Sequence, residues 1–253
     1  MKGLIIAAGR GKRLGSFTDN TPKPLVDIKG SSFFNNTVEQ FKSIGITDIA
    51  AVIGYKKEQF KSFEDITFYE NNDWECNNIL HSMFSAKEFM DDDIIIAYAD
   101  IWFEKTPFLK LKQLENDIVI CVDKNWEDYY INRTEHPISE AENVHYDKNN
   151  NITHIGKHIY TPNSTECSTG EFMGLLKVSK NIIKKFVSEF EILENTLAKD
   201  QSFQNAEKFQ NAYLTDFIQY LINKNYDIRC CLEDKGWAEI DTVQDLENLK
   251  KRI

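Results

Sequence analysis

The chain has 253 residues, of which 42% are hydrophobic and 12% aromatic, and its formal net charge at pH 7 is −10. The hydrophobic share is enough for a sizeable core, and this aromatic content is too high for a disordered protein. The negative charge argues against a general nucleic-acid or membrane-surface binder, because both of those partners select a basic face.

The first half of the chain alternates strand and helix signals. Apolar residues at helical spacing predict helices at 34–44 and 77–90. Short apolar runs predict buried strands at 3–8, 48–54, 66–70, 93–100 and 117–123. This alternation of strands and helices is typical of strand–helix–strand crossover units. We therefore predict a Rossmann-like, doubly wound α/β fold with a mostly parallel sheet.

The pattern changes after residue 123. Residues 126–168 are polar and contain a predicted turn, D-K-N-N-N, between two short strands. Strands are then predicted at 170–179 and 226–233, with two helical segments between them. A helix at 242–253 closes the chain, with Val243, Leu246 and Leu249 expected on its inner face.

A glycine-rich, cationic loop follows the first strand. It runs from Gly9 to Gly15 at the carboxyl end of a predicted parallel strand, where open sheets bind ligands. Its amides could hold phosphate groups and its cations could offset their charge. A dinucleotide fingerprint needs glycine where Leu14 stands, and a P-loop needs a hydroxyl where Arg13 follows Lys12. Taken alone, the loop is compatible with two interpretations, a phosphate-binding site or a tight turn whose cations are solvated.

A lysine between two prolines comes next, in T-P-K-P-L. Pro22 and Pro24 restrict their own φ angles and bias the residues before them toward extended backbone. Lys23 is therefore expected on a stiff tether, which suits a group that stabilises charge in a transition state. The alternative is an exposed lysine in a proline turn.

Together these segments resemble the start of nucleotidyltransferases that join a nucleoside triphosphate to a small phosphorylated acceptor. Their pattern, G-x-G-x-R-[LM] followed by P-K-[PA]-[LM], matches residues 9–14 and 22–25. The resemblance implies the nucleotidyltransferase fold and two catalytic residues, Arg13 at the leaving pyrophosphate and Lys23 at the α-phosphate. It also implies a nucleotide-binding set of Ala8, Gly9, Gly11, Lys12, Arg13, Gly54, Asn78 and Ser82.

Two aspartates are candidate ligands of a divalent cation. Nucleotidyl transfer places two anions side by side, so Mg²⁺ is expected, and one or two carboxylates are enough to hold it. Asp100 ends the strand I-I-I-A-Y-A-D, and Asp241 lies in W-A-E-I-D-T. The resemblance implies that both bind Mg²⁺. The residues alone also allow a turn role for Asp100 and a helix cap for Asp241.

Further segments are similar to cytidylyltransferases that act on phosphocholine, 2-aminoethylphosphonate or phosphorylated glutamine, the last in capsule biosynthesis. These segments are residues 69–82, 122–133, 170–179 and 236–249. The resemblance runs nearly end to end and implies CTP as the nucleotide. We expect one domain, 1–253, in which 1–123 forms the nucleotide-binding half and 124–253 the acceptor-binding and C-terminal half.

The acceptor site is expected in the second half. Lys157 is assigned to the phosphoryl group of the acceptor, although relatives usually carry G-K-K or E-K-P where this chain has G-K-H. An aromatic cage suits a quaternary ammonium, carboxylates a primary amine, and an arginine a carboxylate of the acceptor. The acceptor-binding candidates are Asp123, Trp126, Arg133, Lys157 and Glu171. A cage could also draw on Trp74, Trp102, Tyr129 and Tyr130, and an amine site on Glu142.

The expected function is transfer of CMP from CTP to a small amine-bearing phosphoryl compound, with release of pyrophosphate, for decoration of a surface polysaccharide. A sugar-1-phosphate nucleotidyltransferase and a non-catalytic nucleotide-sensing module remain alternatives. Five cysteines without a C-x-x-C pair, and no apolar run of membrane-spanning length, predict a cytoplasmic protein with reduced thiols. The first apolar run lacks a cleavage site and is not expected to be a signal peptide. The oligomeric state stays open, with a dimer as one option.

Overall fold

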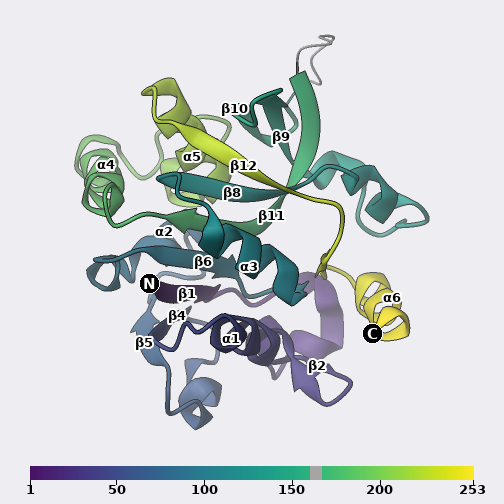
Figure 1. Cartoon of the computed structure of the whole chain (residues 1–253). Coiled ribbons are helices and arrows are strands. Elements are labelled where there is room, and N and C mark those ends of the chain that lie inside the picture. Colours follow the sequence, from purple (N-terminus) through teal and green to yellow (C-terminus); the bar gives the residue numbers. More distant parts are fainter. Residues whose placement is uncertain (160–166) are drawn as a thin grey trace.

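A nine-stranded sheet lies at the centre of the computed structural model, which describes residues 1–159 and 167–253 (Figure 1). The strand order is β10-β9-β11-β6-β1-β4-β5, and β8 and β12 extend the sheet from β11. The strands are β1 (Lys2–Ala7), β4 (Ile49–Ile53), β5 (Thr67–Glu70), β6 (Ile94–Tyr98), β8 (Ile118–Asp123), β9 (Glu142–Asp147), β10 (Ile152–Lys157), β11 (Cys167–Val178) and β12 (Ile228–Glu233).

Most of these strands are parallel. β1 pairs in parallel with β4 and β6, β4 with β5, and β8 with β12. The long strand β11 runs antiparallel to β6, β8 and β9, and β10 runs antiparallel to β9. The predicted α/β fold with a mostly parallel sheet is therefore confirmed, and the carboxyl ends of β1 and β6 lie next to each other.

Helices cover both faces of the sheet. α1 (Phe33–Ser43) and α3 (Lys105–Gln113) pack together on one face, through edge-to-face contact of Phe41 with Phe108. α2 (Ile79–Phe84), α4 (Ile183–Thr196) and α5 (Leu214–Asn223) share an aromatic cluster centred on Phe84. Two covered faces explain why the central strands read as continuous apolar runs rather than alternating ones.

A second, smaller core lies beside the end of the main sheet. It joins the 3-10 helix Lys12–Thr18, the hairpin of β2 (Asp27–Ile28) and β3 (Ser31–Ser32), and α6 (Val243–Arg252). β7 (Ile101–Phe103) and β13 (Trp237–Glu239) pair antiparallel next to it. This arrangement brings the last part of the chain against the first loop, as the positions of α6 and β2 in Figure 1 show.

Two expectations about helices are wrong. The helix predicted at 77–90 ends at Phe84, and a separate 3-10 helix spans Lys87–Phe89. In α6, Leu246 and Leu249 are buried but Val243 is exposed. Residues three apart turn by about 300° around an α-helix, so three such residues in a row drift by about 120° and leave a narrow buried stripe.

The remaining predicted elements agree with the structure to within a few residues, including the turn between β9 and β10. All five cysteines are free. Among the described residues, no helix has both the length and the apolar character needed to cross a membrane.

Candidate active site

The loop after β1 folds around the side chain of Lys23. Gly11 adopts a left-handed conformation, with φ 72° and ψ 50°, which glycine tolerates best. A Cβ atom at Gly11 would lie 2.5 Å from Cδ of Lys23. The buried Leu14 fixes the far end of the loop in the second core, and the Thr18 hydroxyl donates a hydrogen bond to the Gly11 carbonyl. The glycine is therefore required here because the loop and the lysine stem are in contact.

Lys23 lies between the two predicted metal ligands. It starts a short 3-10 helix, Lys23–Leu25, with Pro22 before it and Pro24 after it. Its ammonium nitrogen donates hydrogen bonds to Asp241 Oδ1 at 2.7 Å and to Asp100 Oδ2 at 3.0 Å. The residue is 4% exposed. An exposed lysine in a proline turn is thus excluded.

Asp100 and Asp241 come together from distant parts of the chain. Asp100 follows β6, and its backbone carbonyl accepts a hydrogen bond from the amide of Ile240. Asp241 precedes α6, but the N-cap of that helix is Thr242, so the carboxylate of Asp241 is free to face Lys23. Two carboxylate oxygens thus contact one ammonium nitrogen.

The electrostatics of this cluster favour the charged forms. Burial disfavours the ammonium of Lys23, but the carboxylates of Asp100 and Asp241 outweigh that effect and raise its pKa. For Asp241, burial is outweighed by Lys23 and Arg13, which lower its pKa. Arg13 contributes through a 2.7 Å ion pair from its Nη2 to Asp241 Oδ2. The aspartate is therefore anionic and the lysine cationic at neutral pH.

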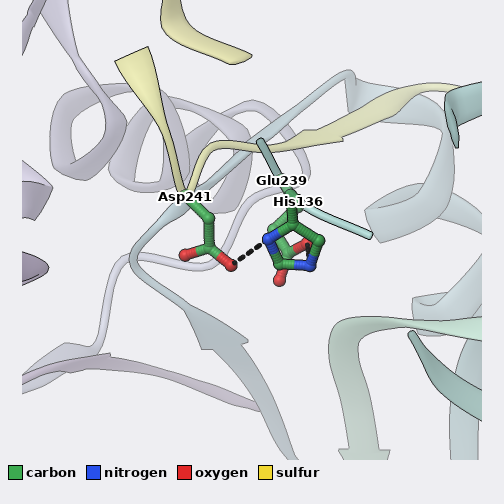
Figure 2. A group of neighbouring side chains, drawn as sticks. All are labelled: His136, Glu239 and Asp241. Carbon is green, nitrogen blue, oxygen red and sulfur yellow. Dashed lines mark ion pairs between the residues drawn. The ribbon is translucent and has the colours of Figure 1, made fainter. Parts of the chain in front are cut away.

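A buried histidine and a glutamate that the sequence analysis did not identify complete the cluster. The Nδ1 atom of His136 lies 3.2 Å from Asp241 Oδ2, and its Nε2 lies 3.9 Å from Glu239 Oε2 (Figure 2). Burial and the nearby Arg133 lower the pKa of His136 to about 4, so its imidazole is neutral. Burial and Asp241 raise the pKa of Glu239 to about 8. No sequence motif marks His136, which belongs to a polar stretch far from both aspartates in the chain.

A cavity of about 220 Å³ opens over Lys23. The predicted residues that line it are Ala8, Gly9, Gly11, Arg13, Lys23, Asn78, Ser82, Asp100 and Asp241. Trp74 and Asn77 also contribute to its wall. Two members of the predicted nucleotide set do not line it. Lys12 is exposed, and Gly54 lies behind the wall, where a Cβ would come within 2.8 Å of Ala8 O and Trp74.

The asparagine-rich segment before α2 is held by its own hydrogen bonds. The Asn71 side chain donates to Asn77 Oδ1 at 2.7 Å and to Ser82 Oγ at 2.9 Å. Asn78 caps α2 by accepting a hydrogen bond from the amide of Ile79, and its side-chain NH₂ donates to the Asn211 carbonyl. These contacts fix the shape of the cavity wall.

Four of the five residues predicted to bind the acceptor do not line a cavity near Lys23, and three of them are described first. Asp123 is buried and accepts a hydrogen bond from Trp237 Nε1, and Glu171 is buried and accepts one from Tyr130. Both are occupied inside the protein because their strands, β8 and β11, are interior strands. Trp126 packs edge-on against Tyr130. None of these three lines either cavity described in this subsection.

Arg133 serves the second core rather than a ligand. Its Nε donates to Asp245 Oδ1 at 2.7 Å, and its Nη2 donates to Asp245 Oδ2 at 3.1 Å and Glu239 Oε2 at 3.3 Å. The side chain is 8% exposed. The guanidinium is thus bound to two carboxylates inside the protein and lines neither the cavity over Lys23 nor the one beside Lys157.

The aromatic cage is also not assembled. Trp74 belongs to the cavity over Lys23 and contacts Tyr55, whereas Tyr129 packs against Trp237. Arg252 lies against the rings of Trp102 and Tyr129. These aromatic residues therefore lie in three groups, Trp74 with Tyr55, Trp126 with Tyr130, and Trp102 with Tyr129 around Arg252, and do not form one cage.

Lys157 lines a second cavity of about 560 Å³, which shares Asn77 and Asn78 with the first. Its ammonium pairs with Glu140 at 3.2 Å and lies 4.9 Å from the centre of the Tyr213 ring. Opposing charges and this ring hold the lysine at the wall of a space that borders the cavity over Lys23.

Comparisons with known proteins show which family the chain belongs to. Residues 3–144 match the model of the MobA-like NTP transferase domain. The chain is 32% identical to CTP:phosphoglutamine cytidylyltransferase of Campylobacter jejuni, with 98% of each chain covered. It is 34% identical over 111 residues to choline-phosphate cytidylyltransferase of Streptococcus pneumoniae, covering 43% of this chain and 48% of that one.

A solved structure supports the fold. The CTP:phosphocholine cytidylyltransferase of Streptococcus pneumoniae superposes with a TM-score of 0.75, at 21% identity, over 99% of this chain and 98% of that one. The glycine loop, the buried lysine and the paired aspartates thus occur on the fold that the matches describe. The chain belongs to the MobA-like NTP transferase family.

Proposed function

We propose that the protein is a CTP-dependent cytidylyltransferase that transfers CMP to a small amine-bearing phosphoryl compound and releases pyrophosphate. The observation that carries this proposal is the contact of Lys23 with both Asp100 and Asp241 beneath the glycine loop. The full-length similarity to a CTP:phosphoglutamine cytidylyltransferase favours CTP as the nucleotide and an amine-bearing acceptor. The product would supply the decoration of a capsule or another surface polysaccharide.

Asp100 and Asp241 fit a magnesium ion. Mg²⁺ prefers oxygen ligands and needs only one or two carboxylates, and these two place oxygens around a single cationic group. When bound, Mg²⁺ would neutralise charge on the triphosphate and on the acceptor.

The chain's own basic groups would then bind and orient the triphosphate. The backbone of Gly9 and Gly11 faces the cavity and can donate to phosphate oxygens. Arg13 is more than half exposed and can turn from Asp241 toward the departing pyrophosphate. Lys23 would stabilise the charge that develops on the α-phosphate oxygens.

The protein needs no nucleophile for this reaction. A phosphoryl oxygen of the acceptor attacks the α-phosphorus of CTP and forms a new P–O bond. The bond from the α-phosphorus to the bridging oxygen breaks, and that oxygen leaves with its electron pair on pyrophosphate. Position and electrostatic stabilisation therefore account for catalysis.

The second cavity is the site that we propose for the acceptor. Lys157 would bind the phosphoryl group. Glu140 and Asp216 line the same space and would favour an ammonium group. Since Asn77 and Asn78 border both cavities, an acceptor held here can present an oxygen to the nucleotide in the first cavity.

A matrix of nucleotides and acceptors tests the proposal. CTP, UTP, dTTP and ATP would each be combined with phosphoglutamine, 2-aminoethylphosphonate, phosphocholine or glucose 1-phosphate, with Mg²⁺ present, and pyrophosphate release measured. We expect release with CTP and an amine-bearing acceptor, and its loss in Lys23→Ala. Release only with a sugar phosphate would identify a sugar-1-phosphate nucleotidyltransferase. CTP binding without release for any acceptor would identify a nucleotide sensor.

A further inference from the structure

The carboxylate of Asp241 has two sides that face different groups. Its Oδ1 atom faces Lys23 at 2.7 Å, on the side of Asp100. Its Oδ2 atom faces Arg13 at 2.7 Å and His136 Nδ1 at 3.2 Å. Each side is thus directed at a positively charged group, and the two sides offer different ligand chemistry, since only the second includes a nitrogen ligand.

His136, Glu239 and Asp241 form a compact group on that second side (Figure 2). One ligand atom from each residue lies within 4.8 Å of the others. Bonds of about 2.1 Å to a common metal ion place ligand atoms about 3–4 Å apart, so small side-chain movements bring the three groups into range. Glu239 and Asp241 come from one segment, and His136 comes from a separate loop.

A second observation points to a ligand at this group. The side chain of His136 is only 2% exposed, yet its Nε2 atom has no hydrogen-bond partner among the described residues. This atom is directed at Glu239 Oε2, but the 3.9 Å separation is too long for a hydrogen bond. Burying a polar atom without a partner is unfavourable, so such atoms are rare unless something else binds them.

We propose that His136, Glu239 and Asp241 bind a first-row transition-metal dication at a site separate from the Asp100–Asp241 magnesium site. An imidazole nitrogen with two carboxylates suits ions such as Mn²⁺, Co²⁺ or Zn²⁺, whereas Mg²⁺ prefers a shell of oxygen ligands alone. Asp241 then bridges the two sites through its two oxygens.

Two guanidinium groups, those of Arg13 and Arg133, lie next to the proposed metal site, and one of them must move before a metal ion can bind. Arg13 contacts Asp241 Oδ2 at 2.7 Å and so competes with the metal for that carboxylate oxygen. Its side chain is 55% exposed and can leave without disturbing the core. Arg133 stays in place, because Asp245 holds it from the other side while it contacts Glu239 at 3.3 Å. Metal binding therefore releases Arg13 toward the cavity.

The test uses the full chain, stripped with a chelator and titrated with Mn²⁺ in the absence of nucleotide. Equilibrium dialysis gives the affinity, and pulsed electron paramagnetic resonance detects coupling of the bound Mn²⁺ to an imidazole nitrogen. We expect nitrogen coupling in the wild type and none in His136→Gln, with affinity at least about tenfold weaker in that variant. His154→Gln, an exposed histidine on β10, is the matched control and should keep the coupling.

Several outcomes would overturn the proposal. These are no nitrogen coupling in the wild type, coupling that survives His136→Gln, and an affinity loss in Asp100→Asn at least as large as in His136→Gln. Glu239→Gln should also weaken Mn²⁺ binding, and it serves as the test if His136→Gln does not fold. Because no nucleotide is present, a negative result leaves the proposed transfer reaction standing, and a failed transfer assay leaves the metal site standing.

Discussion

Lys23 stands between two carboxylates that Mg²⁺ would share in the working enzyme. In the proposed mechanism the lysine is both a structural counter-ion and a group positioned for the α-phosphate. Its two roles fit together, because a fixed ammonium beside the metal ligands lies where negative charge accumulates during transfer.

Lys23→Ala is predicted to lower the rate of CMP transfer by ~10²–10³-fold, the usual scale for loss of one preorganised charge-stabilising donor. The fold should be retained, because Arg13 and His136 still contact Asp241. Pyrophosphate release and far-ultraviolet circular dichroism check the two parts. Lys61→Ala, an exposed lysine outside the cavity, is the control. A fully active Lys23→Ala enzyme would remove the basis of the proposed function.

Glu142 makes stability depend on pH. Burial raises the pKa of Glu142 from 4.5 to about 7, against the opposing effects of Lys157 and of the Thr215 hydroxyl, which donates to it. Between pH 4.5 and 7 the unfolded chain is ionised at this position while the folded chain holds the proton. The folded state then binds more protons than the unfolded state, so its stability falls as pH rises.

We therefore predict that the wild type loses stability relative to Glu142→Gln as pH rises from 4.5 to 7, and that the difference is constant above and below this range. Urea midpoints measured for both proteins at pH 4.5, 5.5, 6.5 and 8 check this. Parallel pH profiles for the two proteins would contradict it.

At the scale of elements, the start of α6 positions Asp241. Asp245 Oδ2 accepts hydrogen bonds from the amides of Asp241 and Thr242 and from the Thr242 hydroxyl. The amide of Asp245 donates to Thr242 Oγ1 in return, which completes a capping box. Arg133 holds Asp245 in turn. A helix cap and a buried ion pair thus fix the backbone of a proposed metal ligand.

Removing this support should affect stability and catalysis together. Thr242→Ala is predicted to cost ~1 kcal/mol, the usual effect of losing an N-cap. Asp245→Ala should cost more, ~3 kcal/mol, because it also leaves the buried Arg133 without its main partner.

Arg133→Lys should lower kcat while leaving KM for the acceptor unchanged. A selective rise in that KM would instead restore Arg133 as an acceptor ligand.

The loop after β1 offers a matched pair of glycines. Gly11 and Gly15 both have positive φ angles, 72° and 55°, so alanine strains the backbone at either position. Only at Gly11 would the added Cβ collide with Lys23, whereas nothing lies within 4 Å of a Cβ at Gly15. We predict a loss of thermal stability in both variants but a much larger loss of transfer activity in Gly11→Ala. Equal activity in the two variants would show that Lys23 does not depend on the loop.

At the scale of the whole molecule, one sheet joins the two halves of the chain. β11, from the second half, lies between β6 and β8 from the first half and pairs with both. β12 then pairs with β8. The proposed nucleotide-binding half therefore lacks a continuous sheet when it is separated from residues 124–253.

This topology predicts a single cooperative unfolding transition. Circular dichroism and tryptophan fluorescence should give the same urea midpoint, because the shared strands couple both halves. The fragment 1–123 should not fold by itself, since its strand β8 would have no neighbour. Two separate transitions, or a folded fragment with native circular dichroism, would show that the halves are independent domains.

The sequence alone was sufficient to predict most strands and the tight turn of the first loop. The run at 94–99 is apolar throughout, which is typical of a strand covered on both faces. The two prolines around Lys23 restrict its backbone locally. The pairing of Asp100 with Asp241 followed from the resemblance and from strand ends. The strands and the restricted backbone of Lys23 depend on neighbours in the chain, so short-range patterns predict them, whereas the aspartate pairing does not.

The tertiary structure alone decided which polar residues reach the site. His136 and Glu239 lie beside Asp241 because a loop and β13 are brought together across more than a hundred residues, and no local pattern encodes that contact. The same packing turned Arg133 toward Asp245 and placed Asp123 and Glu171 inside the sheet. The sequence does not distinguish a charged side chain that binds a ligand from one that pairs inside the protein, because the partner is brought close only in the folded chain.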